Sequence, residues 1–208
     1  MKYLFILLSV VTTYVKSTYI TEAEVSVDAT QEEITPIIDR MIYEFQTNPE
    51  LLFDWAFKGT GQQNDAQADA IVLALADVEY VPEEKKSRMV LNIDVDGKPK
   101  FKNIRVESQV TDSLEADTLL TRLDIHYYGM LFKTIYLNFR VKPIDQNHNI
   151  LVMDTHLQFG WFFNIFVSRK VYRQVAEWRI DRFMNNVKEM IETGEVKDHE
   201  QIDVSDLE

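Results

Sequence analysis

The sequence contains no cysteine among its 208 residues, and this absence excludes several kinds of chemistry. A disulfide framework, a zinc site built on thiolates and a cysteine nucleophile all require that residue. Lipid attachment to a lipoprotein-type cysteine is excluded for the same reason. The absence fits an oxidising compartment in which the protein folds without disulfides, and it fits the cytosol equally well.

Enzyme motifs are also missing. The sequence has no Gly-x-Ser-x-Gly elbow, no P-loop and no dinucleotide fingerprint. Composition leaves Ser/His/Asp catalysis open, but nothing in the sequence selects a nucleophile. We therefore expect a protein that is not an enzyme, and no cofactor is indicated.

Basic residues are few. The chain has 22 Lys and Arg against 34 Asp and Glu, which gives a formal net charge of −12. An acidic chain is repelled by phosphate backbones and by anionic lipid. No basic run is interleaved with aromatic residues, so nucleic acid is not an expected partner.

The longest apolar run, from Tyr3 to Val11, is too short to span a bilayer and is followed by Thr12 and Thr13. It follows the positive charge of Lys2 and precedes a small residue, Ser17. This is the layout of a secretory signal peptide. We expect cleavage of residues 1–17 and export to the periplasm or the medium. A buried first strand and a short membrane anchor are the alternatives.

What remains after cleavage is predicted to be one domain, residues 18–194, followed by an acidic and flexible tail, residues 195–208. Apolar residues make up 46% of the sequence, which predicts a globular fold. Twelve Phe, nine Tyr and three Trp favour β-structure and large buried surfaces. No integral membrane span is expected in the mature chain.

Strand and helix periods alternate in the first third of the domain. Residues 19–27 alternate in polarity as a strand does. Thr30 and Glu33 form a capping-box pattern that opens a helix, although Pro36 is expected to move its start toward Ile34. Asn48-Pro49 ends that helix, and residues 50–57 are expected to form a second, shorter one.

Six segments between residues 70 and 159 have the pattern of strands. Asp96-Gly97 is a hairpin signal, and the polar residues 112–117 predict a further turn. The last three segments each carry apolar side chains on one side and Asp, His or Arg on the other, as in an antiparallel sheet covered on one face. The six predicted strands are residues 70–80, 88–95, 100–110, 118–128, 131–141 and 150–159.

From about Asn164 the period becomes helical, and Gly194 is the expected end. The apolar stripe of this helix comprises Ala176, Ile180, Phe183, Val187 and Met190. The charged residues between them, Arg179 included, are expected on the opposite, solvated face. The element order predicts an α+β fold in which a curved, seven-stranded antiparallel sheet grips a long C-terminal helix.

This order resembles the helix-grip superfamily of START lipid-transfer domains, the birch-pollen-allergen family and the polyketide cyclases. The resemblance covers residues 19–192. It is carried by the strand running into a capped helix at residues 24–33, by the two helices before the second strand, and by the passage from residues 161–166 into the last helix.

The resemblance implies a cavity between sheet and helix that holds a small apolar ligand, such as a lipid, a sterol or an aromatic polyketide. Pockets commonly lie where apolar side chains of two layers converge. The residues expected to line it are Leu137, Phe139, Met153, Leu157, Phe159, Trp161, Phe163, Ile180 and Met184.

Two alternatives remain. One is a structural or protein-interaction domain whose cavity has collapsed, so that adjacent aromatics such as Trp161 and Phe163 serve as core or as a contact surface. The other is a cyclase- or hydrolase-like enzyme, which requires a polar side chain buried in the pocket.

A metal site is not expected, although Asp124-x-His126 and Asp154-x-His156 share the wet face of the sheet. The strand between them separates the two pairs by roughly 10 Å. Tyr136 is expected to stand in the gap. Solvated or cross-strand hydrogen-bonding roles are therefore the favoured interpretation of these four residues.

Overall fold

The computed structural model describes residues 18–60, 71–95, 98–115, 118–128, 132–159 and 169–197. The predicted signal peptide and residues 198–208 of the predicted tail lie outside these ranges. So do Trp161 and Phe163, while Phe159 is described only in its backbone. None of the helices in the described ranges is long and apolar enough to cross a membrane.

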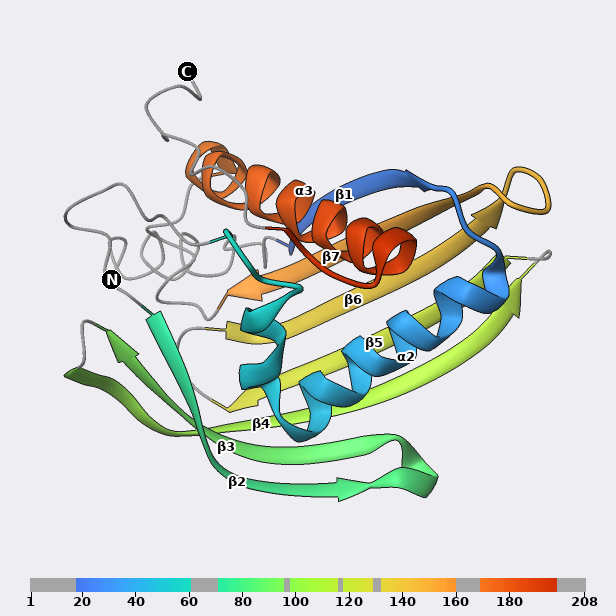
Figure 1. The fold of residues 1–208 in the computed structure, drawn as a ribbon. Helices are drawn as coiled ribbons and strands as arrows, with labels where there is room; N and C mark the ends of the chain where they lie inside the picture. The colour runs from blue at the N-terminus through green and yellow to red at the C-terminus, as the bar shows by residue number, and fades with distance from the viewer. Residues whose placement is uncertain are drawn as a thin grey trace, which may run out of the picture.

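The seven strands form a single antiparallel sheet in the order β1-β7-β6-β5-β4-β3-β2. Figure 1 shows how chain-neighbouring strands lie side by side from β2 to β7, while β1 closes the far edge beside β7. The strands are β1 (Thr18–Val27), β2 (Ile71–Val81), β3 (Lys86–Val95), β4 (Lys98–Glu115), β5 (Thr118–Tyr128), β6 (Phe132–Pro143) and β7 (Asn149–Phe159).

The observed strands confirm the predicted ones within a few residues, except that β4 is longer. The predicted turn at residues 112–117 begins too early, because Glu115 still pairs with Thr118 and Asp112 with Thr121. The backbone ladder of β4 and β5 continues through these polar residues, because cross-strand pairing does not require apolar side chains. Around the predicted Asp96-Gly97 turn, Val95 pairs with Lys98, as a hairpin requires.

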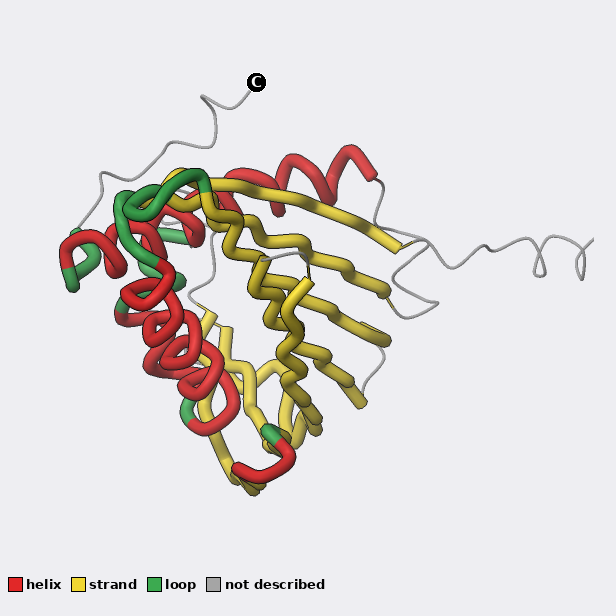
Figure 2. The backbone as a smooth tube through the Cα atoms, turned by 90° about the vertical axis from the view of Figure 1, so that its right-hand side faces the viewer, coloured by secondary structure: helices red, strands yellow, loops and turns green. Residues whose placement is uncertain are grey.

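The sheet curves around its helices, which all lie on its concave side (Figure 2). Breaks in register between Leu75 and Asp77 and between Leu91 and Ile93 bend the strands at one edge. Ala23, Met89, Leu123 and other alternate residues point into this concave side and are buried. The predicted division into a dry and a wet face is confirmed.

Helix α2 (Gln31–Thr47) begins at the capping box predicted from the sequence. The Thr30 hydroxyl accepts a hydrogen bond from the Glu33 backbone N–H at 3.3 Å, and the Thr30 backbone N–H donates to the Glu33 carboxylate at 2.8 Å. The expected shift of the start toward Ile34 is wrong. The reciprocal cap holds the first turn in place, and Pro36 lies within the helix.

Replacing Thr30 with alanine is expected to destabilise the protein by about 1 kcal/mol, because the cap is lost at the first turn. Thr35→Ala in the same helix is the matched control. The Thr35 hydroxyl bonds back to the Gln31 carbonyl, an interaction that does not favour helices. Urea unfolding of both variants measures the difference, and equal stabilities would contradict the role of the cap.

The expected second helix at residues 50–57 is only partly present. Residues Pro49–Asp54 form a short 3₁₀ helix, η1, and the chain then turns. The Trp55 indole N–H donates to the buried carboxylate of Glu44 at 2.7 Å, which draws the chain back onto α2. This tertiary bond ends the helix before residue 57. A second 3₁₀ turn, η2 (Pro82–Glu84), joins β2 to β3.

The last helix, α3 (Arg169–Thr193), ends at Gly194 as predicted. Gly194 has a φ of +79°, and its N–H donates to the Met190 carbonyl at 3.0 Å. The helix lies chiefly along β1 (Figure 1), and its Phe183 ring lies 6.4 Å from the Phe139 ring of β6. The β1 edge is the position that leaves room on the concave face for α2 and η1.

Candidate ligand-binding site

The interior between sheet and helices is tightly packed where β1 ends and α3 ends. Val27, Ile34, Leu151 and Val187 each have 0% exposed surface. The stretch of loop after η1 closes the same region, because Phe57 packs on α3. The buried amides at this end, Asn149 and Asn186, already donate to backbone carbonyls, so this end of the interior is ordinary core.

The other end of the same interior is less fully covered. Four inner-face side chains from β6, β7 and α3 are only half-buried, whereas their neighbours Phe139, Met153 and Met184 are buried. The half-buried four are Ile135, Leu137, Leu157 and Ile180. This half-buried apolar surface beside the core is where a small apolar ligand could pack.

Six of the nine residues predicted to line a pocket therefore lie on this inner surface. They are Leu137, Phe139, Met153, Leu157, Ile180 and Met184. The side chains of the other three, Phe159, Trp161 and Phe163, lie outside the described residues.

A small group of hydroxyls interrupts the apolar surface beside β1. Thr21 donates a hydrogen bond to the Tyr172 hydroxyl at 3.0 Å, and the Tyr19 and Tyr172 rings meet at 4.8 Å. Burial raises the pKa of Tyr172, so its hydroxyl remains protonated at neutral pH. Thr155 is the direct cross-strand partner of Thr21. Its buried Oγ1 has no hydrogen-bond partner among the described residues.

Sequence reasoning missed Thr155, although its position two residues from both Met153 and Leu157 places it on the inner face. The strand alternation contained the signal, but threonine is common on either face of a sheet. Only the register with β1 shows that its hydroxyl lies beside Thr21.

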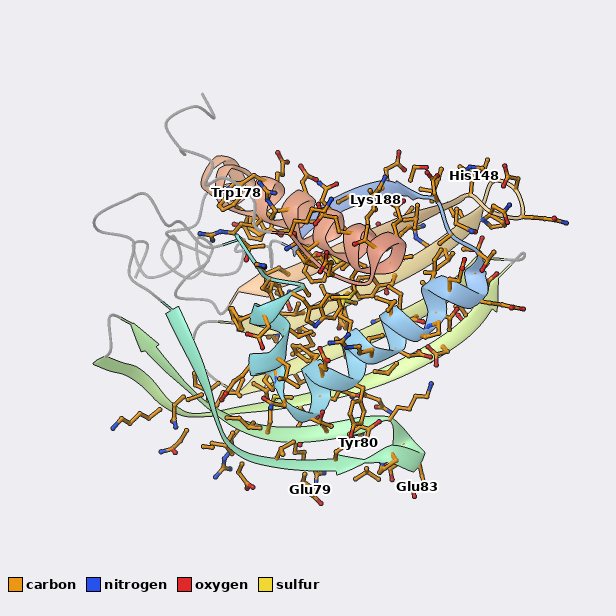
Figure 3. The ribbon with its side chains drawn as sticks, in the orientation of Figure 1. Glu79, Tyr80, Glu83, His148, Trp178 and Lys188 are labelled. Carbon is orange, nitrogen blue, oxygen red and sulfur yellow. The ribbon has the colours of Figure 1, made fainter. Side chains whose placement is uncertain are left out.

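The structure also places Arg179 differently from the sequence-based expectation. It was expected on the solvated face of α3, but its Nε is buried and has no hydrogen-bond partner among the described residues. Burial lowers the pKa of its guanidinium. Figure 3 labels the preceding residue, Trp178, on the first half of α3, and the Trp178 ring lies 5.3 Å from the Arg179 guanidinium carbon.

The wet face holds charged groups that neutralise one another. Arg122 donates to Asp124 at 2.8 Å and also stacks on the Tyr136 ring at 4.4 Å. Arg140 pairs with Asp154. Within the described part of the chain, no three His, Cys, Asp or Glu side chains gather as a metal would need.

Tyr136 stands between the two Asp-x-His pairs as predicted from the sequence. It is the cross-strand partner of Asp124 on one side and of His156 on the other. The aromatic ring therefore occupies the place where a shared ion would have to bind.

A surface hollow of about 280 Å³ lies on β2, β3 and β4. Three of its charged side chains are paired with one another, since Arg88 bonds Glu107 at 3.0 Å and lies 3.8 Å from Glu79. Exposed pairs of this kind bind small molecules weakly because water competes for them. The inner surface of the sheet is the stronger candidate site.

No protein-family model matches the sequence, and no curated protein sequence matches it significantly. Among solved structures, the chain is similar to the Zhui aromatase/cyclase from a Streptomyces species, at 12% identity, TM-score 0.49 and coverage of 86% of this chain and 98% of that one. It is similar to a START superfamily protein from Mycobacterium smegmatis, at 14% identity, TM-score 0.48 and coverage of 83% and 96%. A third is norcoclaurine synthase from Thalictrum flavum, at 12% identity, TM-score 0.47 and coverage of 84% and 87%.

These similarities concern the arrangement of the backbone. The protein's own strand order, with β1 beside β7 and a terminal helix on the concave face, is that of the START-like helix-grip fold.

Proposed function

We propose that this protein binds a small apolar molecule between the concave face of its sheet and helix α3, and that it does so after export directed by residues 1–17. The observation that carries the proposal is the contrast between the two ends of the interior. At one end Val187 has 0% exposed surface, whereas at the other end Leu137 and Leu157 are only half-buried. A bound apolar molecule would remove that surface from water.

The chemistry of the inner face favours holding a molecule over converting it. The buried inner-face side chains of β5, β6 and β7 are aliphatic, aromatic, methionine or threonine, apart from Asn149, whose amide donates to the Ala29 carbonyl. General acid–base catalysis would require a titratable group within hydrogen-bond reach of the substrate. The Thr155 hydroxyl supplies one group that can orient a polar atom of the ligand.

Native mass spectrometry of gently purified protein is the test. We expect a co-purifying small molecule in the wild type, and we expect Leu137→Trp to reduce the occupied fraction about tenfold, because the larger ring fills the half-exposed space. Leu120→Trp is the matched control. Leu120 lies on the neighbouring strand at a position that alternates onto the outer face, opposite Arg140.

A Leu137→Trp variant that folds and retains its ligand as the wild type does would contradict the placement of the site. A stable complex with another protein, recovered without any small molecule, would instead favour the interaction-domain interpretation.

A further inference from the structure

The first half of α3 contains an arginine whose position on the helix is unusual. Arg179 lies seven residues after Tyr172 and four before Phe183, so all three side chains project from nearly the same face. Tyr172 packs on Tyr19 of β1, and the Phe183 ring lies 6.4 Å from the Phe139 ring on the concave face of the sheet. Arg179 therefore projects from the side of α3 that faces the interior.

Arg179 lacks the partner that its burial demands. Its Nε is buried without a hydrogen bond, and no described acidic side chain forms an ion pair with it. The chain carries 34 acidic residues, so acidic partners are abundant in the sequence. A buried guanidinium nitrogen that is left unpaired is unfavourable unless something else pairs with it.

The sequence of the first part of α3 is rich in basic residues although the whole chain is acidic. Between its first residue and residue 182, α3 carries five basic residues and two acidic ones. The planar guanidinium also matches the geometry of a carboxylate, which it can bind through two hydrogen bonds.

We infer that the molecule bound at this site is an amphiphile with a carboxylate head group, which pairs with Arg179 while its apolar part covers Leu137, Leu157 and Ile180. This inference rests on the proposed function and narrows its ligand to one chemical class. A neutral alcohol or hydrocarbon of the same length would fill the apolar surface and leave the guanidinium unpaired.

Calorimetric titration with decanoic acid and with decanol separates the contribution of the carboxylate to binding from that of the apolar chain. The wild type is expected to bind the acid more tightly than the alcohol. Arg179→Gln is expected to lower the affinity for the acid by about tenfold to a hundredfold, the range for a hydrogen bond to a charged group. The affinity for the alcohol is expected to stay unchanged. Arg182→Gln, which makes the same change of charge in the same helix, is expected to leave both affinities as in the wild type.

If Arg179→Gln lowered the affinities for both compounds equally, or lowered neither, the inference would be overturned and the proposed function would stand. Failure of both compounds to bind the wild type would count against the proposed function as well.

Stability provides a second, ligand-independent readout. Arg179→Met replaces the aliphatic stem of the arginine but removes the unpaired charge, so the ligand-free variant is expected to melt at a higher temperature than the ligand-free wild type. A lower melting temperature would show that a group within the protein already satisfies the guanidinium, and it would overturn the inference.

Discussion

Replacing Asn186 with aspartate is expected to destabilise the protein by about 3–5 kcal/mol at neutral pH, the cost of a buried charge without a partner. Asn186 is fully buried, with 0% exposed surface. Its amide donates to the carbonyl oxygens of Ala56 and Lys58, at 3.1 and 2.7 Å. A carboxylate there would face two oxygen acceptors with no hydrogen to offer them.

The effect should depend on pH in a defined direction. Burial would raise the pKa of the introduced carboxyl in the folded state above its unfolded value of about 4. The folded state would then bind more protons, so stability should fall as the pH rises above about 4 and recover as it drops below that value. Denaturant unfolding at several pH values measures this slope.

Asn185→Asp is the matched control, because Asn185 is the adjacent residue and is exposed. Its amide donates only to the Asp181 carbonyl within the same helix. Its substitution should change stability by about 0.5 kcal/mol or less. Similar losses for the two variants would contradict the idea that Asn186 fastens the loop after η1 to α3.

Replacing Phe183 with alanine should cost about 3–5 kcal/mol, the usual range for deleting a buried aromatic side chain. Phe183 is 7% exposed and connects three parts of the fold. Its ring lies 5.1 Å from the Phe57 ring after η1 and 6.4 Å from the Phe139 ring on β6. Removing it would leave a cavity where loop, sheet and α3 meet.

The same substitution at Phe53 provides the comparison. The Phe53 ring lies 5.5 Å from the Phe57 ring, but the side chain is 40% exposed, so its loss should cost about 1 kcal/mol. Thermal and urea unfolding of both variants would show the difference. A small effect at Phe183 would mean that α3 is held on the sheet by its contacts with β1 alone.

The Arg179 correction shows why a charge pattern along a helix is a weak guide to its faces. Helical spacing from Tyr172 and Phe183 placed Arg179 toward the interior, but its charge suggested solvent. The spacing was the better signal because a long side chain can bury part of its length beside apolar neighbours. The prediction of a helix at residues 50–57 was wrong for another reason. The hydrogen bond from the Trp55 indole to Glu44 ends a helix that the local sequence would have continued.

The sequence by itself determined the strands, the two long helices and the dry face of the sheet, since hydrophobic period, the Thr30 cap and Gly194 are local properties that act within one or two turns of chain. The tertiary structure alone decided that α3 lies along β1, that Thr155 stands beside Thr21, and that Arg179 has no described acidic partner. These depend on contacts between residues far apart in the chain. Local sequence patterns do not show which side chain from a distant part of the chain packs at a given position.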